Sequence, residues 1–402
     1  MEESVPAVIL SGGSELVALS VAESLRKHSV PLIVVGLGRP SLIRDLDGVL
    51  AHRQVAWPPA SLEQGIEALL SALRECPGFG ERPWPIFATE DGGLRLLLEG
   101  LEPLSPYLAV PRAHRLKLGG LDKAELFSFL KTGPCAHYLP RTRILDDPDT
   151  ARDALDELGD NAVFKPALKP FGMDLRRLQG KVIARVSAAE TNTSLITRLE
   201  DAWPMSQQWI AQERVLPSSS GEQLWWGARG RHGEVRRILA TERWKQPKEG
   251  GSACWVTVGA EVNVDDMACA LAEELGLEGL MEIPFLLDRE GQPRLLETNP
   301  RAWLQVGLAE LAGAEVIHST YCTLSGTDWR EQTNIVRGVD ASWVNAERVL
   351  LAAWQDSDNR ARMLRQAFEI IREADYPAVY HTRNLRLILR WLGRMARAAL
   401  RQ

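Results

Sequence analysis

The sequence predicts two structural classes in one chain, a doubly wound α/β lobe at the N-terminus and an α+β region after it. Apolar strand-like runs alternate with helix-like segments up to residue 101, which predicts a parallel sheet covered on both faces. Further along, two pairs of strand-like runs are joined by short turns, which predicts antiparallel hairpins. Blocks of strands separated by helices then indicate two small sheets.

The N-terminal lobe is predicted to run strand, helix, strand, helix, strand, helix. The strands cover 7–10, 31–36 and 84–89, and the helices cover 14–30, 61–76 and 94–101. The helices are predicted from apolar positions that recur with the helical period. Ser11, Gly12 and Gly13 match only part of a G-x-G-x-x-G pattern, so we interpret them as a tight turn at a strand end.

From Asp122 onward the pattern changes. Helices are predicted at 121–133, 149–159 and 194–203, and strands at 162–168, 180–186 and 205–216. A hairpin with strands 223–230 and 234–243 turns at Arg231, His232 and Gly233. A second hairpin within 276–301 turns at 288–291, and the chain then becomes helical.

The length of the chain predicts several lobes, because 402 residues exceed what one compact core holds. We expect a Rossmann-like domain over 1–113, a linker and lid over 114–211, an α+β catalytic subdomain over 212–330 and a helical C-terminal segment over 331–402. The composition, 45% hydrophobic and 25% charged, is that of a globular protein.

Charge and cysteine content restrict the class of function. A formal net charge of −6 argues against a dedicated nucleic-acid binder. The five cysteines form no C-x-x-C pair, which favours reduced thiols and a cytoplasmic location. The N-terminus has neither a basic region nor a long apolar core, so no signal peptide is expected. No apolar run reaches membrane-spanning length.

The stretch 294–303 places three chemically useful side chains on alternate positions. Glu297, Asn299 and Arg301 follow a strand-like leucine pair, and Pro300 forbids a regular central strand beyond it. In an extended segment alternate residues point to the same side. A carboxylate, an amide and a guanidinium are therefore expected together at a strand end, where they could face a metal ion and a phosphate.

Two lysines and one polar pair complete the candidate site. Lys123 begins a predicted helix, where a lysine is usually a solvated charge. Lys165 lies inside an apolar strand, where it requires a partner or a ligand. Gln212 and Glu213 lie between apolar residues at a strand end, which is also typical of a solvent-facing edge.

These residues together resemble the ATP-grasp enzymes, and within them the carboxylate–amine ligase-like branch. The segment 295–301, LLETNPR, is similar to the E-x-N-P-R signature of the family, and the spacing of Lys123 and Lys165 resembles its pair of phosphate-binding lysines. The segment 211–216 looks like its adenine-binding hinge strand, and 241–253 resembles a basic stretch of the ligase-like branch.

The resemblance implies a role for each residue. Glu297, with Glu282, and the neutral oxygen of Asn299 would hold Mg²⁺, with Mn²⁺ as an alternative ion. Arg301 would bind a phosphate or acyl-phosphate oxygen. The remaining residues would hold ATP and the reacting groups: Lys123 and Lys165 the α- and β-phosphates, Gln212 and the backbone of Glu213 to Val215 the adenine, Glu222 the ribose, and Arg243 and Lys245 the transferred phosphate or the substrate carboxylate.

Two features depart from the family pattern. The first metal carboxylate of the family usually precedes a Phe on the upstream strand, and here that position is Pro284. Glu282, two residues earlier on the same strand face, is the predicted replacement. The glycine-rich segment that follows the second lysine in the family is missing, and Lys169 and Lys181 are candidates to compensate.

The implied function is an ATP-dependent ligase that joins a carboxylate to an amine through an acyl phosphate, releasing ADP and phosphate. The alternative is an ATP-grasp protein that has lost turnover and binds nucleotide as a regulator or scaffold, which the departures would favour. A kinase-like or carboxylase-like use of the same site is a third hypothesis. The expected partners are a small-molecule carboxylate and amine and no nucleic acid, with a homodimer as a further hypothesis.

The C-terminal tail carries an arginine stripe. Six arginines recur at spacings of three and four, which places them on one face of a helix with leucines opposite: Arg383, Arg386, Arg390, Arg394, Arg397 and Arg401. One interpretation is a terminal helix packed on the body through Leu385, Leu389, Leu392, Met395 and Ala399. The other is a basic amphipathic helix that contacts an anionic membrane or an acidic partner.

Overall fold

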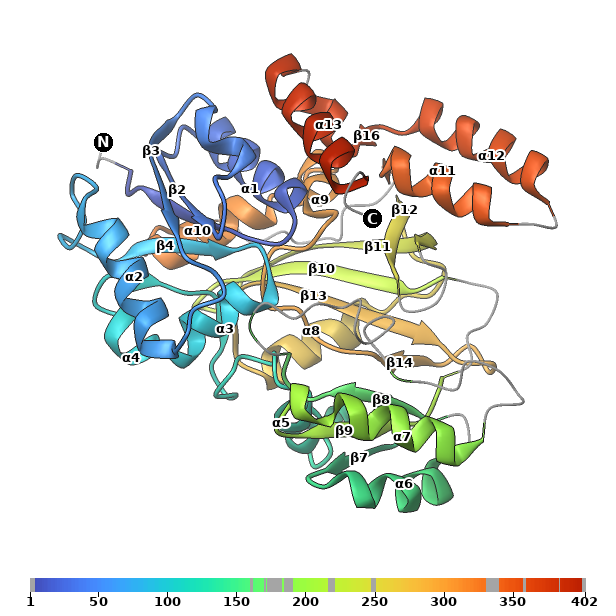
Figure 1. Cartoon of the computed structure of the whole chain (residues 1–402). Coiled ribbons are helices and arrows are strands. Elements are labelled where there is room, and N and C mark those ends of the chain that lie inside the picture. The colour runs from blue at the N-terminus through green and yellow to red at the C-terminus, as the bar shows by residue number, and fades with distance from the viewer. Residues whose placement is uncertain are drawn as a thin grey trace.

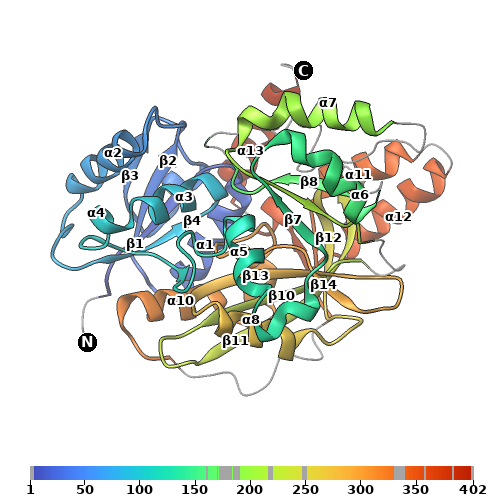
Figure 2. The ribbon, with the colours of Figure 1, turned by 90° about the horizontal axis from the view of Figure 1, so that it is seen from below.

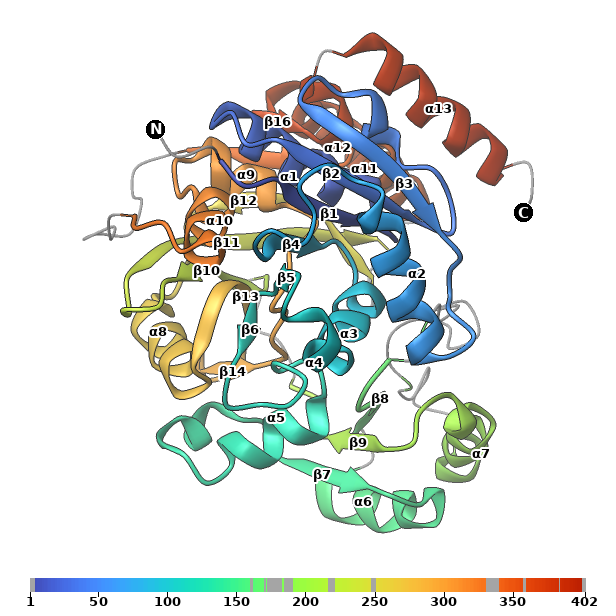
Figure 3. The same ribbon diagram turned by 90° about the vertical axis from the view of Figure 1, so that its left-hand side faces the viewer.

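The computed structural model describes residues 4–159, 162–169, 171, 183, 191–215, 221–246, 251–329, 340–356, 359–382 and 384–399, with side chains through residue 393 in the last helix. It contains three sheets (Figure 1). The N-terminal lobe and the small lid sheet lie on different sides of the largest sheet in Figures 1 and 3. Figure 2 looks onto the lid from below.

The N-terminal lobe is a doubly wound parallel sheet, as predicted. Its strand order is β3-β2-β1-β4-β5. The strands are β1 (Ala7–Ser11), β2 (Leu32–Leu37), β3 (Val49–Val55), β4 (Trp84–Ala88) and β5 (Leu108–Ala109). The helices are α1 (Glu15–Lys27), η1 (Leu42–Asp45), α2 (Leu62–Arg74), α3 (Asp91–Glu99) and α4 (Leu101–Leu104). The sequence missed β3, whose polar centre, His52 to Gln54, hides the strand pattern.

The lid contains a three-stranded antiparallel sheet of order β7-β9-β8, preceded by α5. Its strands are β7 (Thr142–Leu145), β8 (Val163–Pro166) and β9 (Trp209–Gln212). Its helices are α5 (Lys123–Leu130), η2 (Pro134–Tyr138), η3 (Pro148–Thr150), α6 (Ala151–Leu158), α7 (Asn192–Ala202) and η4 (Trp203–Met205). Of the strand predicted at 180–186, Ile183 alone is described, and it pairs antiparallel with Phe164. Lys181 lies outside the described residues.

The largest sheet has the order β14-β13-β10-β11-β12-β15-β16, with β6 also paired to β13. Its strands are β6 (Arg112–Ala113), β10 (Gln223–Arg229), β11 (Val235–Gln246), β12 (Ser252–Val258), β13 (Leu277–Leu287), β14 (Pro293–Leu295), β15 (Ser342–Val344) and β16 (Tyr376–Pro377). Both predicted hairpins are present, as β10–β11 and β13–β14. The sequence did not predict β12 or α8 (Asp265–Glu274).

The remaining helices come from the second half of the chain. These are α9 (Val306–Leu311), α10 (Val316–Ser325), α11 (Ala346–Gln355), α12 (Arg360–Glu373), η5 (Ala378–Thr382) and α13 (Leu385–Ala399). One apolar core joins α1 of the N-terminal lobe to α9, α10 and the strands of the largest sheet. Among the described residues, no helix has the length and apolar character needed to cross a membrane.

The sheets cross the divisions predicted between domains. β6, before residue 114, pairs with β13, and β9 keeps Gln212 in the lid sheet. β15 and β16, from the predicted C-terminal segment, extend the largest sheet. Backbone hydrogen bonds across a sheet therefore tie together segments that the sequence treats as separate units.

Candidate functional site

A cavity of about 810 Å³ lies where the N-terminal lobe, the lid, the largest sheet and the C-terminal helices meet. Its lining is rich in charged groups of both signs. The acidic residues in it are Glu15, Glu90, Asp91, Glu222, Glu242, Glu282 and Glu297. The basic residues are Arg39, Lys123, Lys165, Lys169, Lys245, Arg301 and Arg348. Such a mixture in a concave site is typical of a pocket for a charged ligand and its counter-ion.

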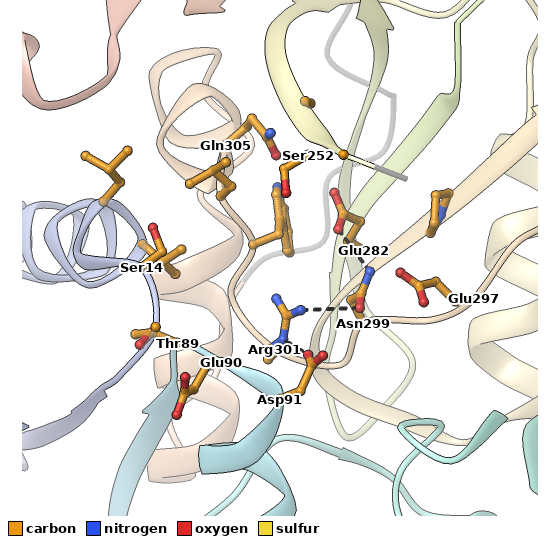
Figure 4. A pocket seen from close by; sticks show the side chains of 18 of the residues that line it. Ser14, Thr89, Glu90, Asp91, Ser252, Glu282, Glu297, Asn299, Arg301 and Gln305 are labelled. Carbon is orange, nitrogen blue, oxygen red and sulfur yellow. Dashed lines mark hydrogen bonds and ion pairs between the residues drawn. The ribbon is translucent and has the colours of Figure 1, made fainter. Parts of the chain in front are cut away.

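The three alternate residues after β14 all line this cavity, as predicted (Figure 4). Two backbone hydrogen bonds hold the segment: Glu282 N–H donates to the Asn299 carbonyl at 3.0 Å, and Asn299 N–H donates to the Glu282 carbonyl at 2.9 Å. The chain thus stays paired with β13 past the end of β14, and the side chains of Glu297, Asn299 and Arg301 share one side.

Glu282 faces the same cavity from β13. Its carboxylate accepts hydrogen bonds from Trp226 Nε1 at 3.0 Å and from Asn299 Nδ2 at 3.1 Å. Burial raises the pKa of Glu282 to about 7, against the effect of the Trp226 hydrogen bond. Pro284 also lines the cavity, so the residues two apart share a face, as the strand period requires.

Glu282, Glu297 and Asn299 form an oxygen-rich set compatible with a hard divalent cation. Mg²⁺ is usually held by one or two carboxylates together with substrate phosphates, not by a complete protein cage. Within the described ranges no group of three or more His, Cys, Asp or Glu side chains is placed to hold a metal ion by itself. The Asn299 amide nitrogen faces Glu282, while its oxygen lies 3.5 Å from Arg301 Nη2.

Two lysines reach the cavity from the lid side. Asp122 caps α5 by accepting from the Ala124 and Glu125 amides at 2.8 and 3.1 Å, which fixes Lys123 at the first helical position. Lys123 Nζ lies 3.3 Å from Glu297 Oε2. Lys165 Nζ donates to Gln212 Oε1 at 2.8 Å. Burial lowers the pKa of Lys165 to about 8, so a bound anion would relieve an unfavourable burial of charge.

The sequence missed Asp91, which joins two of the basic groups. Its carboxylate accepts from Arg301 Nε at 2.5 Å and from Lys169 Nζ. Burial acts to raise the pKa of Asp91, but the charges of Arg301 and Lys169 outweigh it and hold this pKa well below its usual range. One sequence signal was available: Asp91 follows the carboxyl end of a parallel strand, where ligand sites of such sheets lie.

A second charged group lies across the cavity on β11. Lys245 Nζ forms ion pairs with Glu222 and, at 3.1 Å, with Glu242. Burial, and then the charge of Glu222, raise the pKa of Glu242 to about 8. Glu222, predicted to bind ribose, and Lys245, predicted to face the transferred group, therefore contact each other. Glu242 was not predicted.

The side chain of Arg243 lies outside the cavity. This corrects the sequence prediction that Arg243 faces the transferred phosphate or the substrate carboxylate. Arg243 Nε donates to Thr257 Oγ1 at 3.0 Å and its Nη1 to Glu261 Oε1 at 2.7 Å. Register irregularities on either side of Trp244 bring Glu242 and Lys245, three residues apart, into the same cavity. The alternation of a regular strand does not hold here.

The predicted adenine-binding residues lie beside the cavity and do not line it. Gln212 is buried at the end of β9, where it contacts Lys165 and donates to Thr142 Oγ1 at 3.0 Å. The Glu213 carboxylate binds Arg141, and its backbone N–H donates to the Arg141 carbonyl at 2.9 Å. The adenine-binding role of Gln212, Glu213 and Val215 stays a prediction.

Two buried polar atoms of the cavity lining have no hydrogen-bond partner among the described residues. They are Glu90 Oε1 and Trp303 Nε1. Burial, then the charge of Asp91, raise the pKa of Glu90. An unpaired buried acceptor and an unpaired buried donor are both costly, so each marks a place where a ligand could supply the missing partner.

This architecture is an ATP-grasp fold. Residues 230–347 match the family model described as "ATP-grasp in the biosynthetic pathway with Ter operon". No curated protein matches the chain in sequence. Solved structures resemble it in fold at low sequence identity, and the ATP-grasp fold predicted from the sequence is thereby confirmed.

Three of these structures show the extent of the likeness. N5-carboxyaminoimidazole synthetase from Staphylococcus aureus has a TM-score of 0.62 at 14% identity, covering 89% of this chain and 87% of its own. A biotin carboxylase from Campylobacter jejuni, in a β-γ-ATP complex, has 0.63 at 14%, covering 85% and 74%. L-amino acid ligase from Bacillus licheniformis has 0.57 at 13%, covering 80% and 74%.

Proposed function

We propose that the protein is an ATP-dependent ligase that joins a carboxylate to an amine and releases ADP and phosphate. The observation that carries the proposal is the convergence of Lys123, Lys165 and Arg301 with Glu282 and Glu297 on one cavity. Three cations facing two carboxylates suit a magnesium nucleotide, because the triphosphate needs positive charge and the metal needs oxygen ligands. The ligases among the similar folds support the choice of reaction.

In the first step, a carboxylate oxygen of the acid attacks the γ-phosphorus of ATP. The bond from that phosphorus to the β–γ bridging oxygen breaks, ADP leaves and an acyl phosphate forms. Lys123 and Lys165 hold the phosphates that stay with ADP, and Arg301 faces the group in transfer. Positioning and charge neutralisation provide most of the rate in such a transfer.

In the second step, the amine nitrogen attacks the acyl carbon. The bond from that carbon to the phosphate oxygen breaks, inorganic phosphate leaves and the nitrogen loses a proton, which gives the amide. Glu90 is the group we assign to the amine, because its unpaired buried oxygen can accept from an N–H donor. The lid excludes water, which would otherwise hydrolyse the acyl phosphate.

Glu282, Glu297 and Asn299 are the residues that would hold Mg²⁺, or Mn²⁺ as the alternative. When bound, the ion would neutralise charge on the phosphates. Arg301 is already oriented for its role, since Asp91 accepts from its Nε and the Ala302 carbonyl accepts from its Nη1 at 3.0 Å. These contacts fix the guanidinium before any nucleotide arrives.

One observation favours a second candidate, a nucleotide-binding regulator without turnover. Pro284 occupies the position where the family carries a metal carboxylate, and it lines the cavity. If Glu282 does not replace that carboxylate, the protein would bind nucleotide and not complete the transfer.

The test is ADP release from MgATP in the presence of a panel of amino acids and small peptides. A ligase releases ADP only with a matched acid and amine, and Glu297→Gln should lower that rate by roughly 10²-fold, because a carboxylate that would hold Mg²⁺ at the phosphates is lost. Glu290→Gln is the matched control, because Glu290 is exposed at the hairpin turn. No turnover with any pair, while MgATP still raises the melting temperature, would instead support the regulator.

A further inference from the structure

Helix α13 carries an apolar face that the described part of the chain leaves exposed. Leu385, Leu389 and Leu392 are 66%, 58% and 43% exposed. Their spacing of i, i+4 and i+7 places them on one side of the helix. The prediction that these leucines pack on the body is therefore wrong. Met395 and Ala399 belong to the part of α13 whose side chains are not described.

Other residues hold α13 to the protein. Leu387 is buried, Trp391 Nε1 donates to Glu347 Oε1 at 3.3 Å, and Arg390 forms an ion pair with Asp45. The helix lies along the outer edge of the molecule, beside the N-terminal lobe (Figure 3). It is thus fixed by one face while the leucine face is turned outward.

The charge of the tail identifies the kind of surface that would cover this face. Residues 383–402 contain six arginines and no acidic residue. Taking these six positive charges away from the formal net charge of −6 leaves −12 on residues 1–382, so a basic segment lies on an acidic body. Arg386, next to Leu385, is exposed. Exposed leucines flanked by arginine are typical of a helix that lies in the interface of an anionic membrane.

We propose that α13 docks this protein on an anionic lipid surface. Leu385, Leu389 and Leu392 enter the boundary between headgroups and acyl chains, and Arg386 contacts lipid phosphates. A second copy of the chain fits less well, because pairing two such helices would bring arginines of like charge together. An acidic protein would satisfy the arginines without accounting for three adjacent exposed leucines.

The docking helix also forms part of the cavity wall. Trp391, on the same helix, lines the cavity. Docking through α13 therefore brings one wall of the cavity close to the lipid surface, where a substrate carried on a lipid could reach it. This consequence rests on the proposed ligase function, whereas the docking itself does not.

Vesicle co-sedimentation of the full chain tests the proposal. The protein should bind vesicles of phosphatidylglycerol and phosphatidylcholine in equal parts, bind phosphatidylcholine alone far more weakly, and lose anionic binding as salt is added. The triple variant Leu385→Gln, Leu389→Gln, Leu392→Gln should lower the partition coefficient at least about tenfold. Its melting temperature, with and without MgATP, reports whether it is folded.

The matched control is Leu50→Gln, Leu311→Gln, Leu351→Gln, three leucines that are 65%, 47% and 45% exposed elsewhere. This control should bind vesicles within about twofold of the wild type, because its leucines are not flanked by the arginine stripe. Equal binding by the α13 variant, or equal loss in the control, would overturn the proposal. The proposal would also be overturned if the wild type formed a dimer that does not bind vesicles and the α13 variant were monomeric.

Discussion

Asp91 Oδ1 accepts a hydrogen bond from Arg301 Nε at 2.5 Å, which joins the N-terminal lobe to the segment after β14 across 210 positions of sequence. The same carboxylate binds Lys169 of the lid. One side chain therefore connects three parts of the chain at the cavity. It also sets the direction of the guanidinium that the proposed reaction uses.

Asp91→Asn should destabilise the protein by roughly 3–5 kcal/mol, because it leaves Arg301 and Lys169 as buried cations without their anion. Thermal or denaturant unfolding measures this loss. Asp47→Asn is the control: its side chain is fully exposed and 3.7 Å from Arg26, so it should leave the stability nearly unchanged. Equal losses of stability in the two variants would show that the contacts of Asp91 stabilise the protein no more than an exposed ion pair does.

Nucleotide affinity should fall as the pH rises above about 8. A lysine is charged below its pKa, and burial places the pKa of Lys165 at about 8 in the free protein. Below that pH the Lys165 ammonium group is charged and can bind phosphate. Above it, Lys165 must take up a proton before it can bind phosphate, so the affinity falls. Titration calorimetry with MgADP from neutral to alkaline pH measures the effect.

Lys165→Met is the control for this pH dependence. It should bind MgADP more weakly at neutral pH and lose most of the decline above pH 8, since the titrating group is gone. A decline of the same size in the variant would assign the effect to another group.

Glu90→Gln tests whether Glu90 serves amine binding or the stability of the fold. Removing a charge from a buried carboxylate that lacks a hydrogen bond at Oε1 should leave the melting temperature unchanged or raise it. Under the proposed function the same change should raise KM for the amine at least about tenfold, because a charged acceptor is lost. Steady-state kinetics with each substrate varied in turn gives both constants. A variant that loses stability, with KM for the amine unchanged, would give Glu90 a structural role only.

Arg243→Ala should leave turnover within about twofold of the wild type, because this guanidinium binds Thr257 and Glu261 outside the cavity and exposed ion pairs contribute little. Lys245→Met, two residues on, should be far more damaging. It removes the cation between Glu222 and Glu242 and leaves two carboxylates facing each other. ADP release compares the two variants, and the reverse order of effects would restore the prediction made from sequence.

Much of the site could be predicted because it depends on local geometry. Glu297, Asn299 and Arg301 alternate in an extended segment, and Glu282 and Pro284 do so on β13, so each set lines the cavity together. Arg243 was assigned from the resemblance of its segment to a basic stretch of the family, and the backbone irregularities on either side of Trp244, which such a resemblance does not reveal, accompany its position outside the cavity.

The sequence by itself determined much of the order of strands and helices, the two hairpins and the signature segment, because the period of apolar residues and the turn residues act over short distances. Tertiary structure alone decided that Asp91 meets Arg301, that Glu242 shares the cavity with Lys245 and that the leucines of α13 face outward. Those outcomes depend on which surfaces pack together, and burial changes the cost of a charge or an apolar face only after distant segments have met.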